Sequence, residues 1–167
     1  MLFIVIWLPG AGKSTLSKLI QKKYNATILN TDEFRKFIFN INPREKDNIY
    51  PEAIQDMSYK AMFIATKYLL KNKINVIIDA ALYSNKLVKE AKKLSNKSKV
   101  IQVICPEKLV KERLQRRVKK SGQKYSAWIK VYEYMKAKTE IITGIDVVFD
   151  TSKNITIKNI TKNIFTH

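Results

Sequence analysis

The stretch Ile6–Thr15, IWLPGAGKST, follows an apolar run and matches the phosphate-binding loop pattern G-x-x-x-x-G-K-[ST] in every place but one. In such a loop the backbone N–H groups and a helix N-terminus bind phosphate oxygens, the lysine reaches the β and γ phosphates, and the next hydroxyl meets Mg²⁺. We therefore expect ATP and Mg²⁺ as cofactors. The expected phosphate contacts are Pro9, Gly10, Ala11, Gly12, Lys13, Ser14 and Thr15, with Ser14 also a metal ligand. The alternative is a glycine-rich turn that only connects a strand to a helix.

Trp7 stands where the pattern has its first glycine. Tryptophan keeps the backbone N–H, so no donor is lost, but it lacks the freedom of φ that glycine has. As the last residue of a strand, Trp7 is expected in the β region, where the backbone cost is small. Its ring is expected either to border the ligand crevice near Asp79, where it could stack on a base, or to close the core.

Apolar runs alternate with segments of helical spacing along the chain. The expected buried strands are Leu2 to Trp7, Ala26 to Leu29, Ile74 to Ile78, Val100 to Cys105 and Ile145 to Phe149. The expected apolar helix stripes are Leu16, Leu19, Ile20 and Tyr24, then Met57, Ala61, Ile64 and Tyr68, then Val110, Leu114 and Val118. Strands alternating with helices predict a three-layer α/β fold with a mainly parallel sheet, in one domain of residues 1–167. Residues 40–50 and 119–125 are predicted to be mobile.

The composition restricts the chemistry and the partners. The 167 residues include 32 Lys+Arg and 14 Asp+Glu, and the formal net charge of +18 favours an anionic partner such as nucleic acid, a phosphorylated metabolite or an anionic membrane surface. Biased codon usage or adaptation to heat could produce the same lysine-rich texture. The one cysteine, Cys105, excludes an internal disulfide and favours a reducing, cytoplasmic location. The one histidine, His167, leaves a carboxylate or a lysine as any general base.

Acidic residues follow two of the predicted strands. Asp32 and Arg35 lie three residues apart after the second strand, and Asp79 ends the third. Because the carboxyl ends of parallel strands border the ligand crevice, we expect Asp32 to face the phosphate loop as the general base, with Arg35 holding the acceptor or steadying the carboxylate. Asp79 is expected to hold Mg²⁺ through water or to bind the acceptor. The alternative for Asp32 is a structural role at the start of a helix that Thr31 caps. The alternative for Asp79 is that it caps the helix that begins near Ser84.

The segment KLVKERLQRRVKK predicts a helix with arginines on two ridges. Arg113 and Arg117 share one ridge, and Arg116 lies on the next. The forked guanidinium of arginine is suited to bind a γ-phosphoryl group. A helical lid at about residues 113–127 would exclude water from the reaction when it closes. We expect one or two of these arginines to contact ATP, and a solvated basic face is the alternative.

Taken together, these features resemble the P-loop kinases that include polynucleotide 5′-hydroxyl kinase, seryl-tRNA kinase, adenylylsulfate kinase, chloramphenicol phosphotransferase and zeta toxins. The matching motifs are LPGAGKST, TDEFR, IYPEAI, VIIDAALY, ERLQRR and FDTS, which cover nearly the whole chain. The resemblance implies a three-layer P-loop NTPase fold of the nucleoside-kinase-like kind. Its implied sheet has five parallel strands in the order 2-3-1-4-5, beneath a helical lid.

The same resemblance implies roles for individual residues. The implied roles are phosphate and Mg²⁺ binding for Lys13 and Ser14, general base for Asp32, acceptor side for Arg35 and Asp79, and lid arginine for Arg116 or Arg117. The adenine is implied to lie between the lid helix, which carries Arg113, and the loop Thr151, Ser152 and Lys153.

The expected function is an ATP-dependent kinase that transfers the γ-phosphoryl group to a hydroxyl. A nucleic-acid acceptor, such as RNA, tRNA or a polynucleotide 5′-hydroxyl, is slightly favoured by the basic charge. One alternative is the same chemistry on a small anionic metabolite. Another is a P-loop ATPase or switch without an acceptor, in which the pair Asp32 and Arg35 would have no task. No apolar run is long enough to span a bilayer, so we expect no membrane partner.

Overall fold

The computed structural model describes residues 1–40, 50–121 and 125–165, and the remaining residues lie outside the described part. The strands of the described part are β1 (Leu2–Ile6), β2 (Ala26–Asn30), β3 (Asn75–Asp79), β4 (Ser98–Ile104) and β5 (Val147–Asp150). The helices of the described part are α1 (Lys13–Tyr24), α2 (Thr31–Phe39), α3 (Glu52–Lys71), α4 (Asn85–Lys92), α5 (Glu107–Ser121), α6 (Tyr125–Lys138) and α7 (Ile157–Phe165). Within these ranges no helix is both long and apolar enough to cross a membrane.

The five strands form one parallel sheet in the order β2-β3-β1-β4-β5, which confirms the predicted α/β fold and strand order. All five residues of the central strand β1 are buried, because parallel strands are covered on both faces. In the register, Asp79 of β3 lies opposite Val5 of β1 on one side and Asn30 of β2 on the other. The carboxyl ends of β1, β2 and β3 therefore meet at one edge of the sheet.

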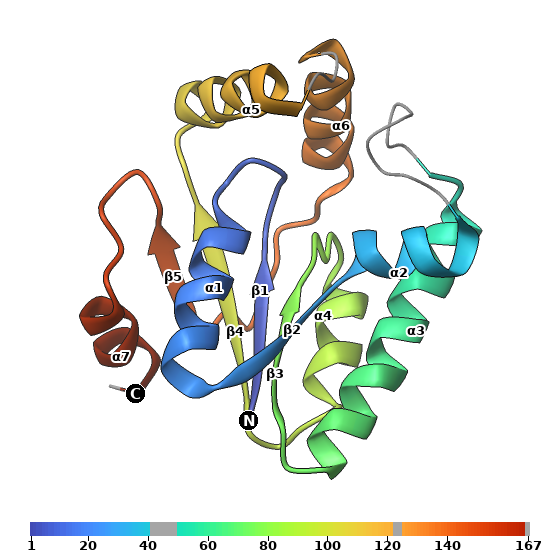
Figure 1. Ribbon diagram of the computed structural model, residues 1–167, viewed down its shortest axis with the longest axis vertical. Helices are drawn as coiled ribbons and strands as arrows, with labels where there is room; N and C mark the ends of the chain where they lie inside the picture. The colour runs from blue at the N-terminus through green and yellow to red at the C-terminus, as the bar shows by residue number, and fades with distance from the viewer. Residues whose placement is uncertain (41–49, 122–124, 166–167) are drawn as a thin grey trace.

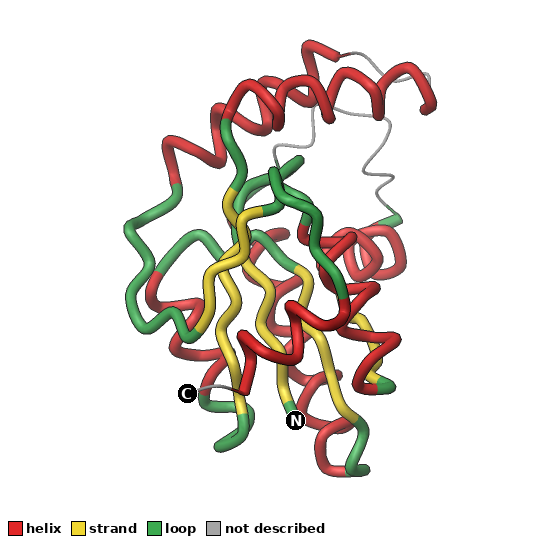
Figure 2. Tube along the Cα trace, turned by 90° about the vertical axis from the view of Figure 1, so that its left-hand side faces the viewer, coloured by secondary structure: helices red, strands yellow, loops and turns green. Residues whose placement is uncertain are grey.

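Two apolar clusters cover the two faces of the sheet. One contains residues of α3 and α4, including Met62 and Leu87, packed on Ile4 of β1. The other contains Leu16 of α1 and Ile160 of α7. Figures 1 and 2 show the resulting sandwich, with the sheet between helices and with α5 and α6 beyond the carboxyl ends of the strands.

Helix α3 buries a different face from the predicted one. Met57, Ile64 and Tyr68 of the predicted stripe are exposed. The buried residues of α3 are Gln55, Ser58, Tyr59, Met62, Phe63 and Thr66. Two hydroxyls on this face are bonded to the carbonyl one turn earlier, Ser58 to Ile54 and Thr66 to Met62. Because these bonds remove the cost of burying the hydroxyls, hydropathy alone pointed to the wrong face.

Helices α5 and α6 form a lid that is held together by apolar packing and by charge. Their shared cluster contains Leu8, Val110, Leu114, Val131, Tyr132 and Met135. Glu107 of α5 accepts a hydrogen bond of 2.6 Å from the ammonium of Lys136 of α6. Of the predicted mobile stretches, residues 119–121 belong to α5, whereas residues 41–49 and 122–124 lie outside the described part.

Candidate active site

The loop between β1 and α1 depends on two glycines with positive φ, 79° at Gly10 and 101° at Gly12. A Cβ atom at Gly10 would lie 2.9 Å from Cγ1 of Val110, and one at Gly12 would lie 3.1 Å from Cγ2 of Thr151. The loop therefore packs its backbone directly against the lid helix α5 and against the residue that follows β5. Glycine satisfies both the backbone conformation and the close approach.

Trp7 has a φ of 136°, so the prediction of a β-region backbone at this position is wrong. This conformation favours glycine, and holding another residue in such a region costs about 1–3 kcal/mol. The ring packs against the apolar cluster of the α1 face and against the lid cluster. Trp7 is absent from the lining of both cavities described below, so its packing agrees with the core-closing alternative rather than with stacking beside Asp79.

Lys13 is folded back onto its own loop. Its ammonium donates a hydrogen bond of 3.2 Å to the carbonyl oxygen of Leu8. Burial lowers the pKa of Lys13, and the charge of Arg117 lowers it further, whereas the carboxylates of Asp79 and Asp32 act in the opposite direction. The cation therefore lies in a desolvated position, where a phosphate would be its natural counter-ion.

Asp32 and Arg35 form an ion pair in the first turns of α2. Nη1 of Arg35 lies 2.7 Å from Oδ1 of Asp32, and the Arg35 side chain is 9% exposed whereas that of Asp32 is 59% exposed. The N-cap of α2 is Asn30, whose side chain accepts hydrogen bonds from the backbone N–H groups of Asp32 and Glu33. The alternative of a Thr31 cap is therefore wrong, and the Asp32 carboxylate is held by a buried arginine while it remains accessible.

The surroundings of Arg35 are aromatic. Its guanidinium carbon lies 4.9 Å from the centroid of the Tyr50 ring. Burial raises the pKa of Tyr59, while the neighbouring Arg35 acts to lower it. Nε of Arg35 is buried and has no hydrogen-bond partner among the residues that the structure describes. Arg35 therefore holds Asp32 from a buried position beside an aromatic ring.

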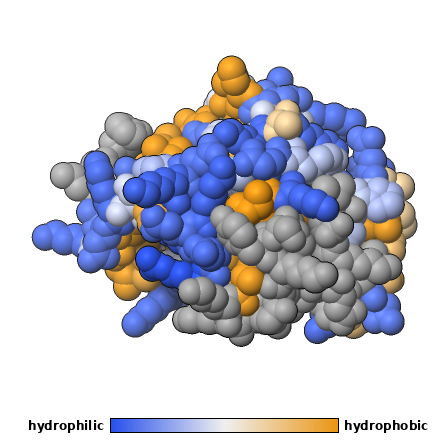
Figure 3. All heavy atoms as spheres, turned by 90° about the horizontal axis from the view of Figure 1, so that it is seen from above, coloured by the Kyte–Doolittle hydropathy of each residue, from blue (hydrophilic) through white to orange (hydrophobic). Residues whose placement is uncertain are grey.

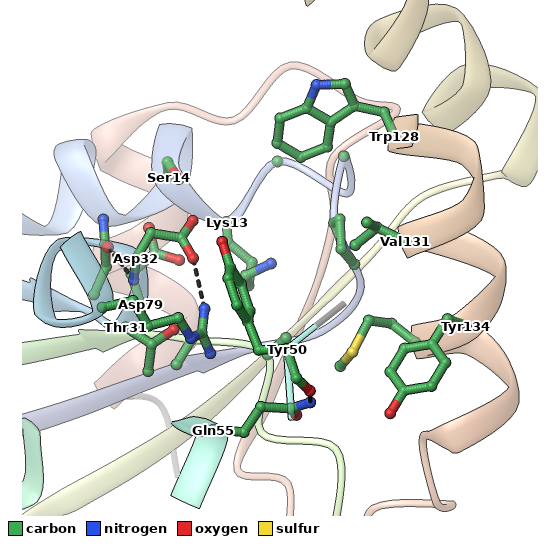
Figure 4. Close-up of a pocket in the computed structure, with 18 of the residues that line it drawn as sticks. Lys13, Ser14, Thr31, Asp32, Tyr50, Gln55, Asp79, Trp128, Val131 and Tyr134 are labelled. Carbon is green, nitrogen blue, oxygen red and sulfur yellow. Dashed lines mark hydrogen bonds and ion pairs between the residues drawn. The ribbon is translucent and has the colours of Figure 1, made fainter. Parts of the chain in front are cut away.

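A first cavity brings the phosphate loop and the acidic residues together (Figure 4). It is lined by Pro9, Gly10, Gly12, Lys13, Ser14, Thr15, Asn30, Thr31, Asp32, Arg35, Tyr50, Gln55, Tyr59, Asp79, Ala80, Ala81, Arg117, Trp128, Val131, Tyr134 and Met135. Most of the predicted catalytic and metal residues therefore border one space, among them Lys13, Ser14, Asp32 and Asp79.

The donor set of this cavity fits Mg²⁺. Ser14 supplies a hydroxyl, and Asp32 and Asp79 supply carboxylates. Mg²⁺ prefers oxygen ligands and keeps several waters, so it binds through few protein groups together with phosphate oxygens. Helix α4 is capped by Ser84, so Asp79 does not cap that helix.

A second cavity lies on the other side of the phosphate loop, between α5 and the segment after β5. It is lined by Gly10, Gly12, Thr15, Arg113, Arg117, Thr151, Lys153, Asn154 and Ile155. This is the place where the resemblance implied the adenine. Ser152 is absent from the lining, and its hydroxyl and backbone N–H bond to Asp150 instead.

Arg113 borders the second cavity, but its guanidinium is already bonded to protein groups. It donates to the hydroxyl and the carbonyl oxygen of Thr151 at 2.9 Å and 2.6 Å. It also donates to the carbonyl oxygen of Ala11 at 3.4 Å. These bonds connect α5, the phosphate loop and the end of β5, so Arg113 braces the wall of the cavity.

The two remaining lid arginines occupy different environments. Arg117 lines both cavities, and its guanidinium carbon lies 5.3 Å from the centroid of the Trp128 ring. Arg116 is 75% exposed, lies 3.9 Å from a carboxylate oxygen of Glu112 and lines neither cavity. Of the two candidates for the lid arginine, Arg117 is the one at the site.

Several residues at the site escaped the sequence reasoning. Tyr50, Trp128 and Tyr134 line the first cavity. Thr151 was expected beside the adenine, but its hydrogen bond to the phosphate loop was not predicted. Gln55 also lines the first cavity, and its amide donates to the carbonyl oxygen of Tyr50. The aromatic residues looked like ordinary core residues in the sequence. Only the spacing of Trp128, Val131 and Tyr134, which share a helix face, could have indicated a common wall.

Solved structures of kinases share this fold. A sugar kinase from Janibacter sp. has a TM-score of 0.72 and 13% sequence identity, with 92% of this chain and 86% of that chain covered. The APS kinase CysC of Mycobacterium tuberculosis, solved in complex with AMPPNP and APS, has a TM-score of 0.68 and 14% identity, with 96% and 93% covered. At these identities the likeness shows the fold alone.

A third likeness is to a chain in a structure of the Pnkp1/Rnl/Hen1 RNA repair complex. Its TM-score is 0.59 and its sequence identity is 26%, with 84% of this chain covered. The match spans only 46% of that longer chain. A comparison with curated protein sequences found no match.

The family comparison agrees with the geometry of the phosphate loop and the sheet. A family model, AAA_33, described as "AAA domain", matches residues 2–142, which include the loop, both acidic strand ends and the lid helices α5 and α6. The chain therefore belongs to the AAA_33 family and has the fold of a P-loop kinase.

Proposed function

We propose that this protein is an ATP- and Mg²⁺-dependent kinase that transfers the γ-phosphoryl group to a hydroxyl acceptor. The observation that carries the proposal is the position of Asp32. Its accessible carboxylate, paired with the buried Arg35, borders the same cavity as Lys13 and Ser14 of the phosphate loop. An ATPase or a switch would not need this pair beside its phosphates.

Asp32 is the proposed general base that accepts the proton of the attacking hydroxyl. The sequence leaves a carboxylate or a lysine for this task, and the Asp32 carboxylate is accessible and borders the cavity. Arg35 holds the carboxylate of Asp32 in place through the 2.7 Å ion pair. Lys13 and Arg117 are the cations that stabilise the charge of the phosphoryl group in transit.

Ser14 and Asp79 would hold Mg²⁺, the hydroxyl directly and the carboxylate through water. When bound, the metal ion neutralises charge on the phosphate oxygens. The chain's own residues bind the rest of the nucleotide. The backbone of Gly10 and Gly12 meets the phosphates, and the second cavity, between α5 and Asn154, receives the base.

The proposed acceptor is a nucleic acid with a free 5′-hydroxyl. The net charge of +18 supports an anionic polymer. The 26% identity to a chain of an RNA repair complex supports the same class of acceptor. A small anionic metabolite is the competing acceptor, since a buried arginine at the site would serve it as well.

An acceptor panel tests the function. The protein is incubated with ATP labelled at the γ-phosphate, Mg²⁺ and either short 5′-hydroxyl RNA, unmodified tRNA, adenylylsulfate or simple sugars and alcohols. Transfer to RNA is the expected result. Transfer to adenylylsulfate or a sugar alone would assign the metabolite. ATP hydrolysis without transfer to any acceptor would overturn the kinase proposal.

A further inference from the structure

Helix α6 presents one continuous face to the first cavity. Trp128, Val131, Tyr134 and Met135 line the cavity, and Lys138 follows on the same face at helical spacing. Figure 4 shows Trp128, Val131 and Tyr134 along one wall, with the ring of Tyr50 standing between this wall and the carboxylate of Asp32. The wall that faces the proposed base is therefore built from aromatic and apolar side chains.

Several aromatic rings of this region are paired with a cation. Arg117 lies over Trp128 at 5.3 Å and Arg35 over Tyr50 at 4.9 Å. Beyond the cavity, the ammonium of Lys138 lies 4.3 Å from the ring centroid of Tyr83 and 5.7 Å from that of Tyr134. Proteins bind single-stranded nucleic acid on surfaces where cations alternate with aromatic rings. The phosphates lie at the cations and the bases stack on the rings.

Several polar side chains of the cavity are already bonded to other groups of the protein. The side-chain oxygen of Asn30 caps α2, and the side-chain amide of Gln55 donates to the carbonyl oxygen of Tyr50. Arg35 is engaged with Asp32. A hydroxyl-rich acceptor would leave its own groups unpaired against the aromatic wall, which costs affinity.

The aromatic rings and their cations extend over a length greater than that of one nucleotide. From Trp128 to Lys138 the helix rises by about 15 Å, at about 1.5 Å per residue, and successive nucleotides of a stacked strand are about 3.4 Å apart. Figure 3, viewed from the lid end, shows mostly hydrophilic side chains with small hydrophobic patches between them on the coloured surface.

We infer that the α6 face is a track for a single strand of nucleic acid. The terminal nucleotide lies beside Asp32, between Tyr50 and Trp128, and the following nucleotides run along Tyr134 to Lys138 and Tyr83. This inference rests on the proposed kinase function and adds to it the binding site of the acceptor strand.

Binding of a 3′-fluorescein-labelled, 5′-hydroxyl hexauridylate, measured by fluorescence anisotropy at several salt concentrations, tests the track. Tyr134→Leu should weaken binding by about 10-fold, because it removes one stacking ring, and should leave the salt dependence unchanged. Lys138→Gln should weaken binding and reduce the slope of log K against log salt by about 0.7, the value for one phosphate contact on a single strand.

Two variants serve as matched controls. Tyr134→Phe keeps the ring and should bind like the parent protein. Lys60→Gln removes an exposed α3 lysine that is paired with Asp56 and lies outside the cavity lining, so it should change neither affinity nor slope. Thermal unfolding of each variant checks that it is folded. If Tyr134→Leu does not fold, the Lys138→Gln and Lys60→Gln pair still decides the outcome.

The two proposals fail in different ways. If phosphate is transferred to a nucleoside or metabolite but hexauridylate does not bind, the track is overturned and the kinase proposal stands. The same holds if phosphate is transferred and Lys138→Gln and Lys60→Gln have equal effects on binding. Binding of hexauridylate with the expected variant effects but without phosphoryl transfer keeps the track and overturns the kinase. Weakening by Tyr134→Phe equal to that by Tyr134→Leu also overturns stacking on the ring.

Discussion

Arg113 donates hydrogen bonds of 2.9 Å and 2.6 Å to the hydroxyl and the carbonyl oxygen of Thr151, two residues that are far apart in the sequence. The Thr151 hydroxyl in turn donates to the carbonyl oxygen of Ala11 at 2.5 Å. A residue expected to contact the nucleotide is thus part of a brace that holds the phosphate loop against the last strand.

Replacing Thr151 tests this brace. Thr151→Val keeps the shape but leaves Ala11 and Arg113 without the hydroxyl, so we expect a loss of about 1–3 kcal/mol in the free energy of unfolding. Urea denaturation measures the loss. Thr151→Ser is the control, because it keeps the hydroxyl. An unchanged stability of Thr151→Val would mean that the bonds do not support the loop.

Asp32→Asn tests the general base. If Asp32 accepts the proton, kcat should fall by about 10²-fold or more, while the affinity for ATP is nearly kept, because Asp32 lies outside the second cavity. Steady-state kinetics and nucleotide titration separate the two effects. Glu33→Gln, at the exposed neighbouring position, is the matched control and should be near the parent rate. Equal rates for both variants would remove Asp32 from the mechanism.

Arg117→Ala and Arg116→Ala form a second matched pair. Arg117 borders both cavities, and Arg116 is exposed and borders neither. We expect Arg117→Ala to lower kcat by about 10³-fold, the effect of an arginine that stabilises a phosphoryl group in transit, and Arg116→Ala to stay within about twofold, since exposed side chains away from a site contribute little. A larger loss for Arg116→Ala would contradict this assignment.

The pH dependence of nucleotide binding reports on Lys13. Burial lowers the pKa of its ammonium from the usual 10.5, so the charged form that binds phosphate is lost as the pH rises through a value below 10.5. The affinity for ATP should therefore fall with rising pH, and at a lower pH than it would for an ordinary lysine. Isothermal titration calorimetry at several pH values measures the fall. Lys13→Arg stays charged, so the same decline in that variant would assign the titration to another group.

Trp7 allows a test of backbone strain. Trp7→Gly and Trp7→Ala both remove the ring, but only glycine accepts a φ of 136° without strain. We expect the glycine variant to be the more stable of the two by about 1 kcal/mol, the reverse of the usual order within a strand. Denaturant unfolding of the two variants measures the difference in their stability. Higher stability of the alanine variant would show that the loop relaxes when the ring is removed.

The sequence alone predicted much of the fold, because the relevant signals are local. Buried strands read as apolar runs, and their alternation with helices specifies a parallel sheet through short-range geometry. The spacing of three residues between Asp32 and Arg35 fixes their pairing on one helix turn, whatever surrounds them. The glycines of the phosphate loop are needed by its backbone conformation, which the motif already encodes.

Tertiary structure decided what depends on contacts between distant segments. Whether α3 buries Tyr59 or Ile64 depends on which face the sheet and the hydroxyl bonds accept. The lid helix presents Arg117 rather than Arg116 because Val110 and Leu114 pack against the loop and against α6. Thr151 carries no sign of its role in its own sequence neighbourhood. Its partners lie on α5 and in the phosphate loop, and only the folded chain brings them within hydrogen-bonding distance.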